Sequence, residues 1–418
     1  MVFHAFLLLI TAPLTTEFTF PTGEFEDEYH FNSAMYDLLS GIFGADILFN
    51  SEWYGYLPAS DDPKNDNKPD WLLCAFSELC TSRDKPKNKF AKDINYAADC
   101  IPFLSGIIEG KMSKGSLMAK DVEPLFRYLK LLGNAGHEKP RGIVYNRTEV
   151  LYAEYTTDGG IKCVEKVDWT RLGDGSILKE KFEPPRIVQA LSLVLGENRS
   201  LMLSSYLRGG RFGQVFKVKK EEKVFALKFV MDEDDFEKFR LEFKKLSAAN
   251  NAAPDLVVHP VPDSLVVKMD ARVKHAYYLM DEVGTASKYL LRRQVFYLLY
   301  RLHENGLSHG DPRLQNIISY NNSLKWIDMR DSHAGNSTDS MFNDVVDVIG
   351  CCFNVSLDTV GRNEVVVRWI REIYIRHISQ EAMGTLYDHV SRMWDFVFSF
   401  RHNSCNFQHH YKQLHIQK

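Results

Sequence analysis

The stretch from Gly306 to Ser332, GLSHGDPRLQNIISYNNSLKWIDMRDS, constrains the fold most, because it is too polar and too short to form a core. Asp311 and Asn316 lie on a loop after the helix-period run YLLRRQVFYLLYRLHENG, and Asp328 ends the strand-like run LKWID. Such oxygen-bearing side chains suit Mg²⁺, which keeps several waters and takes one or two carboxylates beside phosphate oxygens. The stretch therefore predicts a helix, a polar loop and a strand around a metal-bound phosphate.

The length and composition of the chain indicate a globular protein of several domains. At 418 residues the chain exceeds the size at which a single core keeps growing, so two domains, or three, are expected. Its 45% hydrophobic and 12% aromatic residues are enough to bury a core. The formal net charge of -4 is small for this length, so nucleic-acid binding would require a local basic patch.

The cysteines indicate the redox state of the compartment, and the apolar runs indicate whether the chain could cross a membrane. The cysteines are odd in number and lack CxxC spacing, which argues against a disulfide framework and a thiolate zinc site and favours a reducing compartment. They are Cys74, Cys80, Cys100, Cys163, Cys351, Cys352 and Cys405. The apolar run from Phe6 to Ile10 is similar to part of a secretory signal, but without a basic region before it a buried strand or a truncated start is favoured. No run reaches the roughly 18 apolar residues that span a bilayer, so no membrane partner is expected.

The chain separates into regions of different pattern. Up to Leu172, FNSAMYDLLSGIF and KDVEPLFRYLKLLG predict helices, the second ending at Gly133, while FLSGIIEGK and RGIVYNRTEVLYAEY predict strands. The segment RLGDGSILKEKFEPP is rich in turn signals and predicts a linker. Strands are expected from Ile187 to AYYLMDEV, and helices from Tyr289 to about Phe400. The predicted boundaries are residues 20–172, a linker at 173–186, a second domain at 187–400 and a polar tail at 401–418.

The tail contains several histidines, which a metal site could use. They are His402, His409, His410 and His415. A solvated, frayed end is favoured over a metal site there.

A glycine-bearing hairpin opens the second domain. In YLRGGRFGQVFKVKKEEKVFALKFV two alternating runs flank Gly210 and Gly213, whose lack of Cβ lets the turn approach a ligand. Lys228 lies on the following strand, where it can reach phosphates under the turn. The next helix pattern, DDFEKFRLEFKKL, offers Glu242 to hold the lysine, with Glu237 as an alternative. These residues also predict phosphate binding.

Together, four segments resemble the protein-kinase family. HGDPRLQN is similar to the catalytic loop HRDLxxxN, IDMRD to the DFG magnesium segment, GGRFGQVF to the Gly-rich loop and FALK to the VAIK strand. The resemblance covers roughly Leu201 to Gly350 and the segments occur in the family's order. It implies an α+β bilobal protein-kinase-like domain, ATP and Mg²⁺ as cofactors, and transfer of phosphate to Ser or Thr hydroxyls of a protein substrate.

The resemblance also assigns roles by position. Asp311 becomes the catalytic base and Arg313 the cation beside the γ-phosphate, while Asn316 and Asp328 become the Mg²⁺ ligands. Lys228 contacts the α- and β-phosphates with Glu242 as its partner, and His309 takes the place of the scaffold histidine. The remaining nucleotide-binding positions are the loop glycines, two strand residues and the hinge: Gly210, Gly213, Val215, Ala226, Met280 and Val283.

Several positions depart from the kinase pattern. Arg208 stands where the first loop glycine is expected, and the loop contains Gly-Asp-Pro in place of Arg-Asp-Leu. Met329 and Arg330 replace Phe and Gly, no APE segment follows, and Asp344 is the candidate for the buried aspartate of the later helix. Regulation by activation-loop phosphorylation is therefore not expected. HGD also occurs in aminoglycoside-phosphotransferase-like kinases, so a small-molecule acceptor stays open as an alternative. Arg208 and the altered DFG segment leave an inactive pseudokinase open as well.

The first domain carries its own acidic pattern. Asp70 begins an apolar run, and Glu109 and Lys111 share one face at the end of another, because strand side chains alternate. Two carboxylates and a lysine at strand ends can bind Mg²⁺ and position a water against a phosphodiester. With the helix and strands that follow, this resembles the PD-(D/E)xK nuclease core, which implies an α/β restriction-endonuclease-like domain and DNA as a partner.

The basic run between these segments is a weaker sign of DNA binding. Lys85, Lys87, Lys89 and Lys92 could contact phosphates, but a solvated loop is favoured. A nuclease-like domain followed by this kinase-like domain resembles the architecture of crinkler-type effectors, which implies secretion into a host cell and action in its nucleus; otherwise an intracellular protein is expected. The rival hypotheses are a Mg²⁺-dependent DNA nuclease or DNA-binding protein with a nucleotide-sensing pseudokinase domain, and a non-catalytic scaffold.

Overall fold

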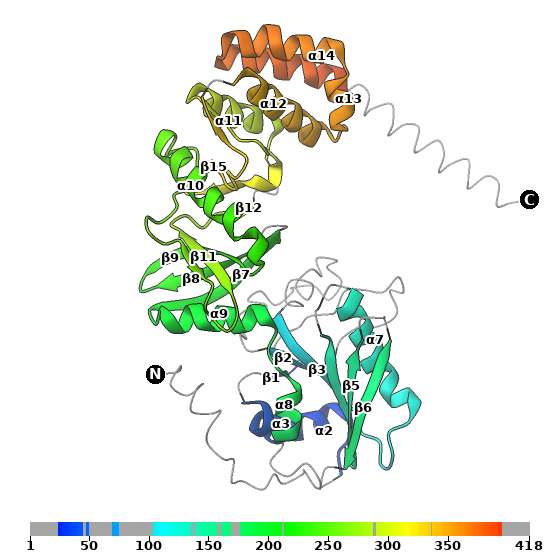
Figure 1. Cartoon of the computed structure of the whole chain (residues 1–418). Helices are drawn as coiled ribbons and strands as arrows, with labels where there is room; N and C mark the ends of the chain where they lie inside the picture. Colours follow the sequence, from blue (N-terminus) through cyan, green and yellow to red (C-terminus); the bar gives the residue numbers. More distant parts are fainter. Residues whose placement is uncertain are drawn as a thin grey trace, which may run out of the picture. The chain divides into compact units, whose positions relative to one another are not determined.

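The computed structural model shows a mixed α/β protein with several sheets (Figure 1), as the sequence predicted. It describes residues 24–44, 47–49, 69–74, 103–134, 137, 139–156, 160–168, 176–210, 213–286, 290–335 and 337–394. Two compact units are present. Unit 1 contains residues 1–208 with 216–222, and unit 2 contains residues 209–215 with 223–418.

Some predicted features lie outside the described residues. One is the apolar run from Phe6 to Ile10. The others are the basic run, with Lys85, Lys87, Lys89 and Lys92, and the polar tail, with His402, His409, His410 and His415. Three cysteines also lie outside: Cys80, Cys100 and Cys405. Cys74, Cys351 and Cys352 lie among the described residues, where Cys74 and Cys352 are buried.

Unit 1 is built on a six-stranded sheet in sequential strand order. Its strands are β1 (Ile47–Phe49), β2 (Trp71–Cys74), β3 (Leu104–Gly110), β4 (Arg141–Tyr145), β5 (Glu149–Tyr155) and β6 (Ile161–Asp168). All neighbours are antiparallel except β3 and β4. A parallel pair needs a crossover, and α7 (Ala119–Asn134) supplies it between these two strands.

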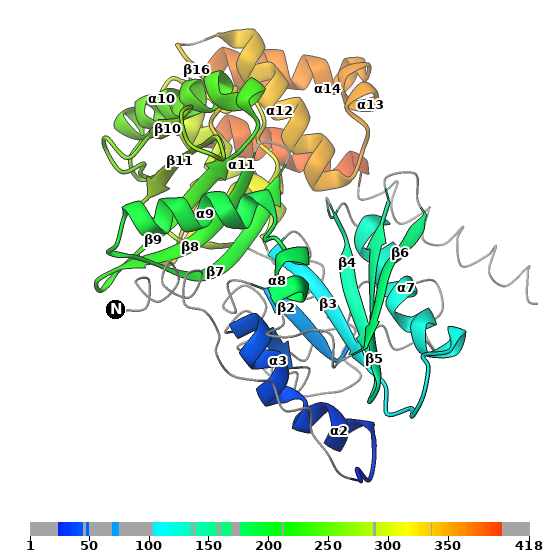
Figure 2. The same cartoon turned by 60° about the horizontal axis from the view of Figure 1, so that its bottom comes forward.

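Helices cover both faces of this sheet. Successive side chains of a strand point to opposite faces, so each strand contributes residues to the packing on both. On β4, Gly142 faces Leu125 and Leu129 of α7, whereas Ile143 and Tyr145 belong to the core on the other face. That core includes residues of α2 (Glu28–Ala34) and α3 (Tyr36–Phe43), and α3 contacts α8 (Ser176–Lys181) (Figure 2). The single helix predicted over FNSAMYDLLSGIF is thus two helices, divided at Met35.

Two predictions between the domains were wrong. Residues 176–181, expected as part of the 173–186 linker, form α8, because the apolar Leu178 and Phe182 pack into the core of unit 1. The strands expected from Ile187 begin only after α9 (Arg186–Glu197). The apolar residues there recur at helical spacing, with Val188, Leu191 and Leu195 buried along one side of α9.

A second sheet has the strand order β10-β11-β9-β8-β7. The strands are β7 (Leu201–Gly210), β8 (Gly213–Lys220), β9 (Lys223–Val230), β10 (Val266–Lys268) and β11 (His275–Met280). In unit 2, β9 and β11 are antiparallel. The helix α10 (Phe236–Ala252) packs against β11, where the ring centroids of Phe239 and Tyr278 lie 4.9 Å apart. This packing positions Glu242 of α10 beside the sheet.

The rest of unit 2 is mainly helical, as expected after Tyr289. Its helices are α11 (Arg292–Glu304), α12 (Thr338–Phe353), α13 (Leu357–Gly361), α14 (Glu364–Arg368), a π-helical turn (Trp369–Tyr374) and residues 380–394. Short strands β12 (Thr285–Ala286), β14 (Ile317–Tyr320) and β15 (Ser323–Trp326) form one small sheet, and β13 (Leu307–Ser308) pairs with β16 (His333–Ala334). Residues 329–337 alone separate Asp328 from α12.

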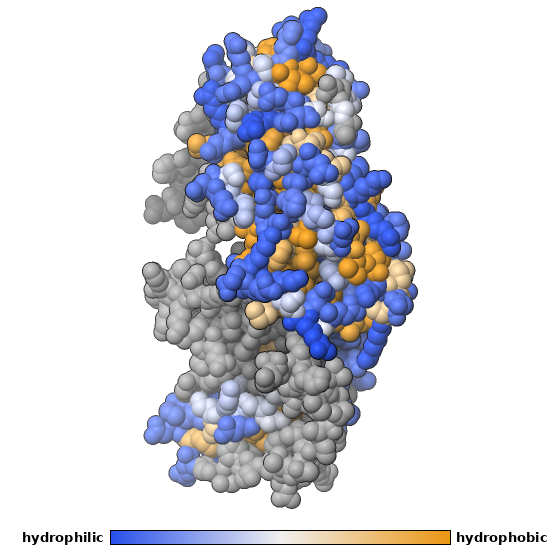
Figure 3. Space-filling view, turned by 90° about the vertical axis from the view of Figure 1, so that its left-hand side faces the viewer, coloured by the Kyte–Doolittle hydropathy of each residue, from blue (hydrophilic) through white to orange (hydrophobic). Residues whose placement is uncertain are grey.

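The described surface is polar with scattered apolar groups. On the face in Figure 3, hydrophobic residues form patches that hydrophilic residues separate. Exposed apolar side chains of unit 2 include Leu241, Met269 and Leu291. Among the described residues, no helix combines the length and apolar character that a bilayer crossing requires.

Candidate functional site

Strand β9 and helix α10 bring Lys228 and Glu242 together in unit 2. The Nζ of Lys228 lies 2.5 Å from Oε1 of Glu242, and the two side chains are 11% and 1% exposed. Glu237, the alternative partner, is 87% exposed and pairs with Arg240. The structure thus joins Lys228 to Glu242 and leaves Glu237 outside the pair.

Asp328 contacts the same lysine. Its Oδ1 lies 3.4 Å from the Nζ of Lys228, across 100 residues of sequence. Asp328 has a φ of +62°, a left-handed conformation that a residue with a side chain rarely adopts and that is often found at functional sites. Burial alone would lower the pKa of Lys228, but Glu242 and Asp328 raise it above its ordinary value, so the lysine is charged.

The loop before β14 holds the other predicted catalytic residues. The Nδ2 of Asn316 donates to the backbone oxygen of Asp311 at 2.9 Å and to its Oδ2 at 3.3 Å. The guanidinium of Arg313 forms an ion pair with the same carboxylate. Asn316 is buried, whereas the side chain of Arg313 is 53% exposed. Asp311, Arg313 and Asn316 therefore form one connected group.

A buried aspartate of α12 anchors this loop. The carboxylate of Asp344 accepts from the backbone N–H groups of His309 at 2.6 Å and Gly310 at 2.8 Å. It also contacts the Nε2 of His303, whose Nδ1 lies 2.8 Å from the hydroxyl of Tyr374. Asp344 is fully buried, so these contacts fix the backbone next to Asp311.

Gly310 explains why the loop lacks the arginine of the kinase pattern. It has a φ of +85°, and a Cβ there would overlap the backbone oxygen of Asp331. Any side chain would therefore separate the loop from the segment after Asp328. Met329 is fully buried in the core, while Arg330 forms an ion pair with Asp331.

The predicted nucleotide-binding positions lie on β7 to β11 and just beyond. Ala226 pairs in register with Met280, both buried, and Val215 and Val283 are half-buried beside the core. Gly210 ends β7. Gly213 has a φ of +114°, and a Cβ there would overlap the backbone oxygen of Phe229. The missing Cβ thus lets the backbone of Gly213 lie close to β9. From the sequence, the approach of a ligand was the expected reason for this glycine.

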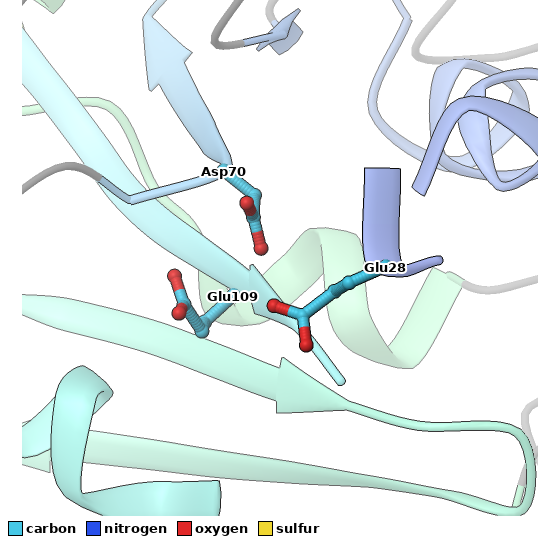
Figure 4. A group of neighbouring side chains, drawn as sticks. All are labelled: Glu28, Asp70 and Glu109. Atoms are coloured by element: carbon cyan, nitrogen blue, oxygen red, sulfur yellow. The ribbon is translucent and has the colours of Figure 1, made fainter. Parts of the chain in front are cut away.

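Unit 1 contains a separate acidic group (Figure 4). Asp70 precedes β2, Glu109 lies on β3, and Glu28 projects from α2; one carboxylate oxygen from each lies within 4.8 Å of those from the other two. The Nζ of Lys111 lies 2.9 Å from Oε1 of Glu109 and 3.0 Å from Oε1 of Glu28. The N–H of Gly110 donates to Asp70 at 2.8 Å. The three residues predicted from the sequence therefore meet, and Glu28 joins them.

Negative charge exceeds positive charge within this acidic group. Burial, and then the charge of Glu109, raise the pKa of Asp70 to about 7. Burial also raises the pKa of Glu109, whose buried Oε2 has no hydrogen-bond partner among the described residues. For Lys111, burial opposes the charged form, but Glu109 and Glu28 raise its pKa. Three hard oxygen ligands and one unsatisfied buried oxygen fit a divalent cation such as Mg²⁺.

Glu28 was missed at the sequence level. It stands at the beginning of α2, far along the chain from Asp70, and no local motif links the two. The only signal is an acidic residue in the first turn of an amphipathic helix, which helix capping explains equally well.

Comparison with known proteins adds no family to these observations. No protein-family model matches the chain, and no curated protein matches it significantly in sequence.

Proposed function

We propose that unit 2 is an ATP- and Mg²⁺-dependent phosphotransferase of the protein-kinase type, acting on Ser or Thr hydroxyls of proteins. The observation that carries the proposal is the position of Lys228, whose ammonium lies between the carboxylates of Glu242 and Asp328. Glu242 and Asp328 lie on separate segments, and the loop of Asp311 and Asn316 precedes Asp328. An isolated solvated lysine would not need two partners from distant parts of the sequence.

Each residue has a role that its geometry supports. Asn316 and Asp328 would hold Mg²⁺, which neutralises the charge of the phosphates when it is bound. Lys228 would contact the phosphates while Glu242 orients its ammonium. Asp311 would accept the proton of the attacking hydroxyl, and Arg313 would supply positive charge beside the transferred group.

Transfer of label from ATP tests this proposal. The full chain, with labelled ATP, Mg²⁺ and a mixture of proteins, should label protein, and Asp311→Ala should lower the rate about 10²- to 10⁴-fold with ATP affinity nearly unchanged. Asp358→Ala is the matched control, because Asp358 is an exposed residue of α13 that pairs with Arg362. Full activity of Asp311→Ala would contradict the assigned role. Transfer to small hydroxyl compounds alone would replace the protein acceptor by a small molecule.

We also propose, as a second function, that unit 1 is a Mg²⁺-dependent nuclease acting on DNA. The observation that favours it is the convergence of Glu28, Asp70 and Glu109, together with the unsatisfied Oε2 of Glu109. These carboxylates would hold a divalent cation, which lowers the pKa of a bound water when present. Lys111 would stabilise negative charge on the scissile phosphate.

Nicking of supercoiled plasmid tests this second function. The full chain with Mg²⁺ should nick the plasmid, and Glu109→Ala should lose most of that activity. Glu123→Ala is the control, because Glu123 is an exposed residue of α7. Equal nicking by Glu109→Ala and the unchanged protein would point to a contaminant.

For the whole chain we propose an effector of the crinkler type, delivered into a host cell and acting in its nucleus. The combination of a nuclease-like and a kinase-like domain supports this proposal. A fluorescent fusion expressed in host cells should gather in nuclei, and exclusion from nuclei would contradict the proposal.

A further inference from the structure

Tyr278 on β11 reaches the lysine–glutamate pair from the sheet. The register places it directly opposite Lys228 on β9. Its hydroxyl donates to Oε1 of Glu242 at 2.5 Å, the same oxygen that lies 2.5 Å from the Nζ of Lys228. Tyr278 and Glu242 are each only 1% exposed. One buried carboxylate oxygen therefore accepts from two donors, both supplied by the sheet.

The ring of Tyr278 also contacts the helix that carries Glu242. Its centroid lies 4.9 Å from that of Phe239 and 5.2 Å from that of Phe243. These two phenylalanines lie before and after Glu242 on α10. Burial, and then the charge of Glu242, raise the pKa of Tyr278 well above its ordinary value, so the phenol keeps its proton. The side chain thus combines ring packing with a hydrogen bond to the helix.

We propose that Tyr278 is a positioning residue that keeps Glu242 paired with Lys228 when no nucleotide is bound. The inference rests on the proposed phosphotransferase function and adds a residue to its site. A carboxylate buried with a single donor can rotate away, and two donors from adjacent strands limit that rotation. The hydroxyl thereby holds the ammonium of Lys228 where phosphates would meet it.

Tyr278→Phe tests the hydroxyl, because it keeps the ring between Phe239 and Phe243. In the full chain, the affinity for ATP with Mg²⁺, measured by calorimetry, should fall about tenfold, as expected for one hydrogen bond to a charged group. Without nucleotide, Lys228 should react several-fold faster with an amine-acylating reagent, followed by peptide mass spectrometry, because an amine released from its carboxylate loses its proton more readily. A purely structural role would not change this reactivity.

Tyr277→Phe is the matched control, because it makes the same change on the same strand, one residue away and on the opposite face. It should change neither the affinity nor the acylation of Lys228. If Tyr278→Phe behaved like Tyr277→Phe in both measurements, the positioning role would be overturned.

Two further outcomes separate this inference from the proposed function. If the unchanged protein bound no ATP, the phosphotransferase proposal would fail, whereas the acylation of Lys228 would still decide the role of Tyr278. If Tyr278→Phe could not be purified, 3-fluorotyrosine introduced at Tyr278 would decide, since its more acidic hydroxyl is a stronger donor. Acylation of Lys228 should then be slower than in the unchanged protein, and an equal rate would overturn the inference.

Discussion

Both units place a lysine between two carboxylates, but the surroundings of the two lysines differ. In unit 2, Lys228 lies between Glu242 and Asp328, and Glu242 also accepts from a tyrosine hydroxyl. In unit 1, Lys111 contacts Glu109 and Glu28, while Asp70 adds a third carboxylate and one oxygen of Glu109 stays without a partner among the described residues. In unit 2, the protein supplies two hydrogen-bond donors to Glu242. In unit 1, three carboxylates share one lysine, and the donors of the described residues do not satisfy all of their oxygens.

This difference shows what each group of side chains needs from a ligand. The pair in unit 2 is complete before anything binds, so a nucleotide would meet an ammonium that Glu242 already holds in place. In unit 1, burial and then the neighbouring carboxylates raise the pKa of Asp70 and Glu109, so both carboxyls are held in a place that disfavours their charged form. We therefore expect a divalent cation to change the stability of unit 1 more than that of unit 2.

Removal of each lysine should give the largest contrast. Lys228→Ala leaves Glu242 buried without its cation and should lower the free energy of unfolding of unit 2 by about 3 kcal/mol. Lys111→Ala should cost unit 1 about 1 kcal/mol, because its carboxyls can take up protons instead, and Mg²⁺ should recover that loss. Hydrogen exchange of peptides from each unit measures both effects. If both variants lost the same free energy of unfolding and Mg²⁺ changed neither loss, the proposed difference between the two lysine sites would be wrong.

Gly310→Ala should have the next largest effect, through the loop that supports Asp311. The new Cβ would meet the backbone oxygen of Asp331 at a positive φ, so unit 2 should lose about 2 kcal/mol and the rate of transfer should fall with it. Gly361→Ala is the control, because a Cβ on that residue of α13 meets nothing within 4 Å. Thermal unfolding of the two variants provides the measurement, and equal melting temperatures would show that the loop can move away.

The pH dependence of unit 1 should report on Asp70. The pKa of Asp70 is about 7 in the folded protein against an ordinary value of 3.8. The folded state therefore binds a proton that the unfolded state has released between these values, and stability should fall as the pH rises from about 4 to about 7. Asp70→Asn should flatten this slope in denaturant unfolding without metal. An unchanged slope would assign the effect to other groups.

The sequence predicted the parts of both groups that lie in short contiguous motifs. Asp311, Asn316 and Asp328 fall within one stretch, and Glu109 and Lys111 are two residues apart on one strand, so local spacing was enough to group them. Glu28 and Tyr278 were missed for the opposite reason. Their roles depend on tertiary contacts with residues far along the chain, and locally they are an acidic helix start and an apolar strand residue.

The errors in the fold have a similar cause. Residues of α9 were predicted as strands because short apolar runs do not distinguish a strand from one side of a helix. The helix α8 was predicted as linker because Pro184 and Pro185 dominate the local pattern, whereas the burial of Leu178 and Phe182 stabilises it. In both places the deciding contribution is packing against other elements, which local composition does not contain.

The short connection from Asp328 to α12, residues 329–337, has a consequence for how such a protein would be controlled. A long hinged segment that folds or unfolds upon chemical modification has no place between these two points. Chemical modification of such a segment would therefore not control the proposed transfer.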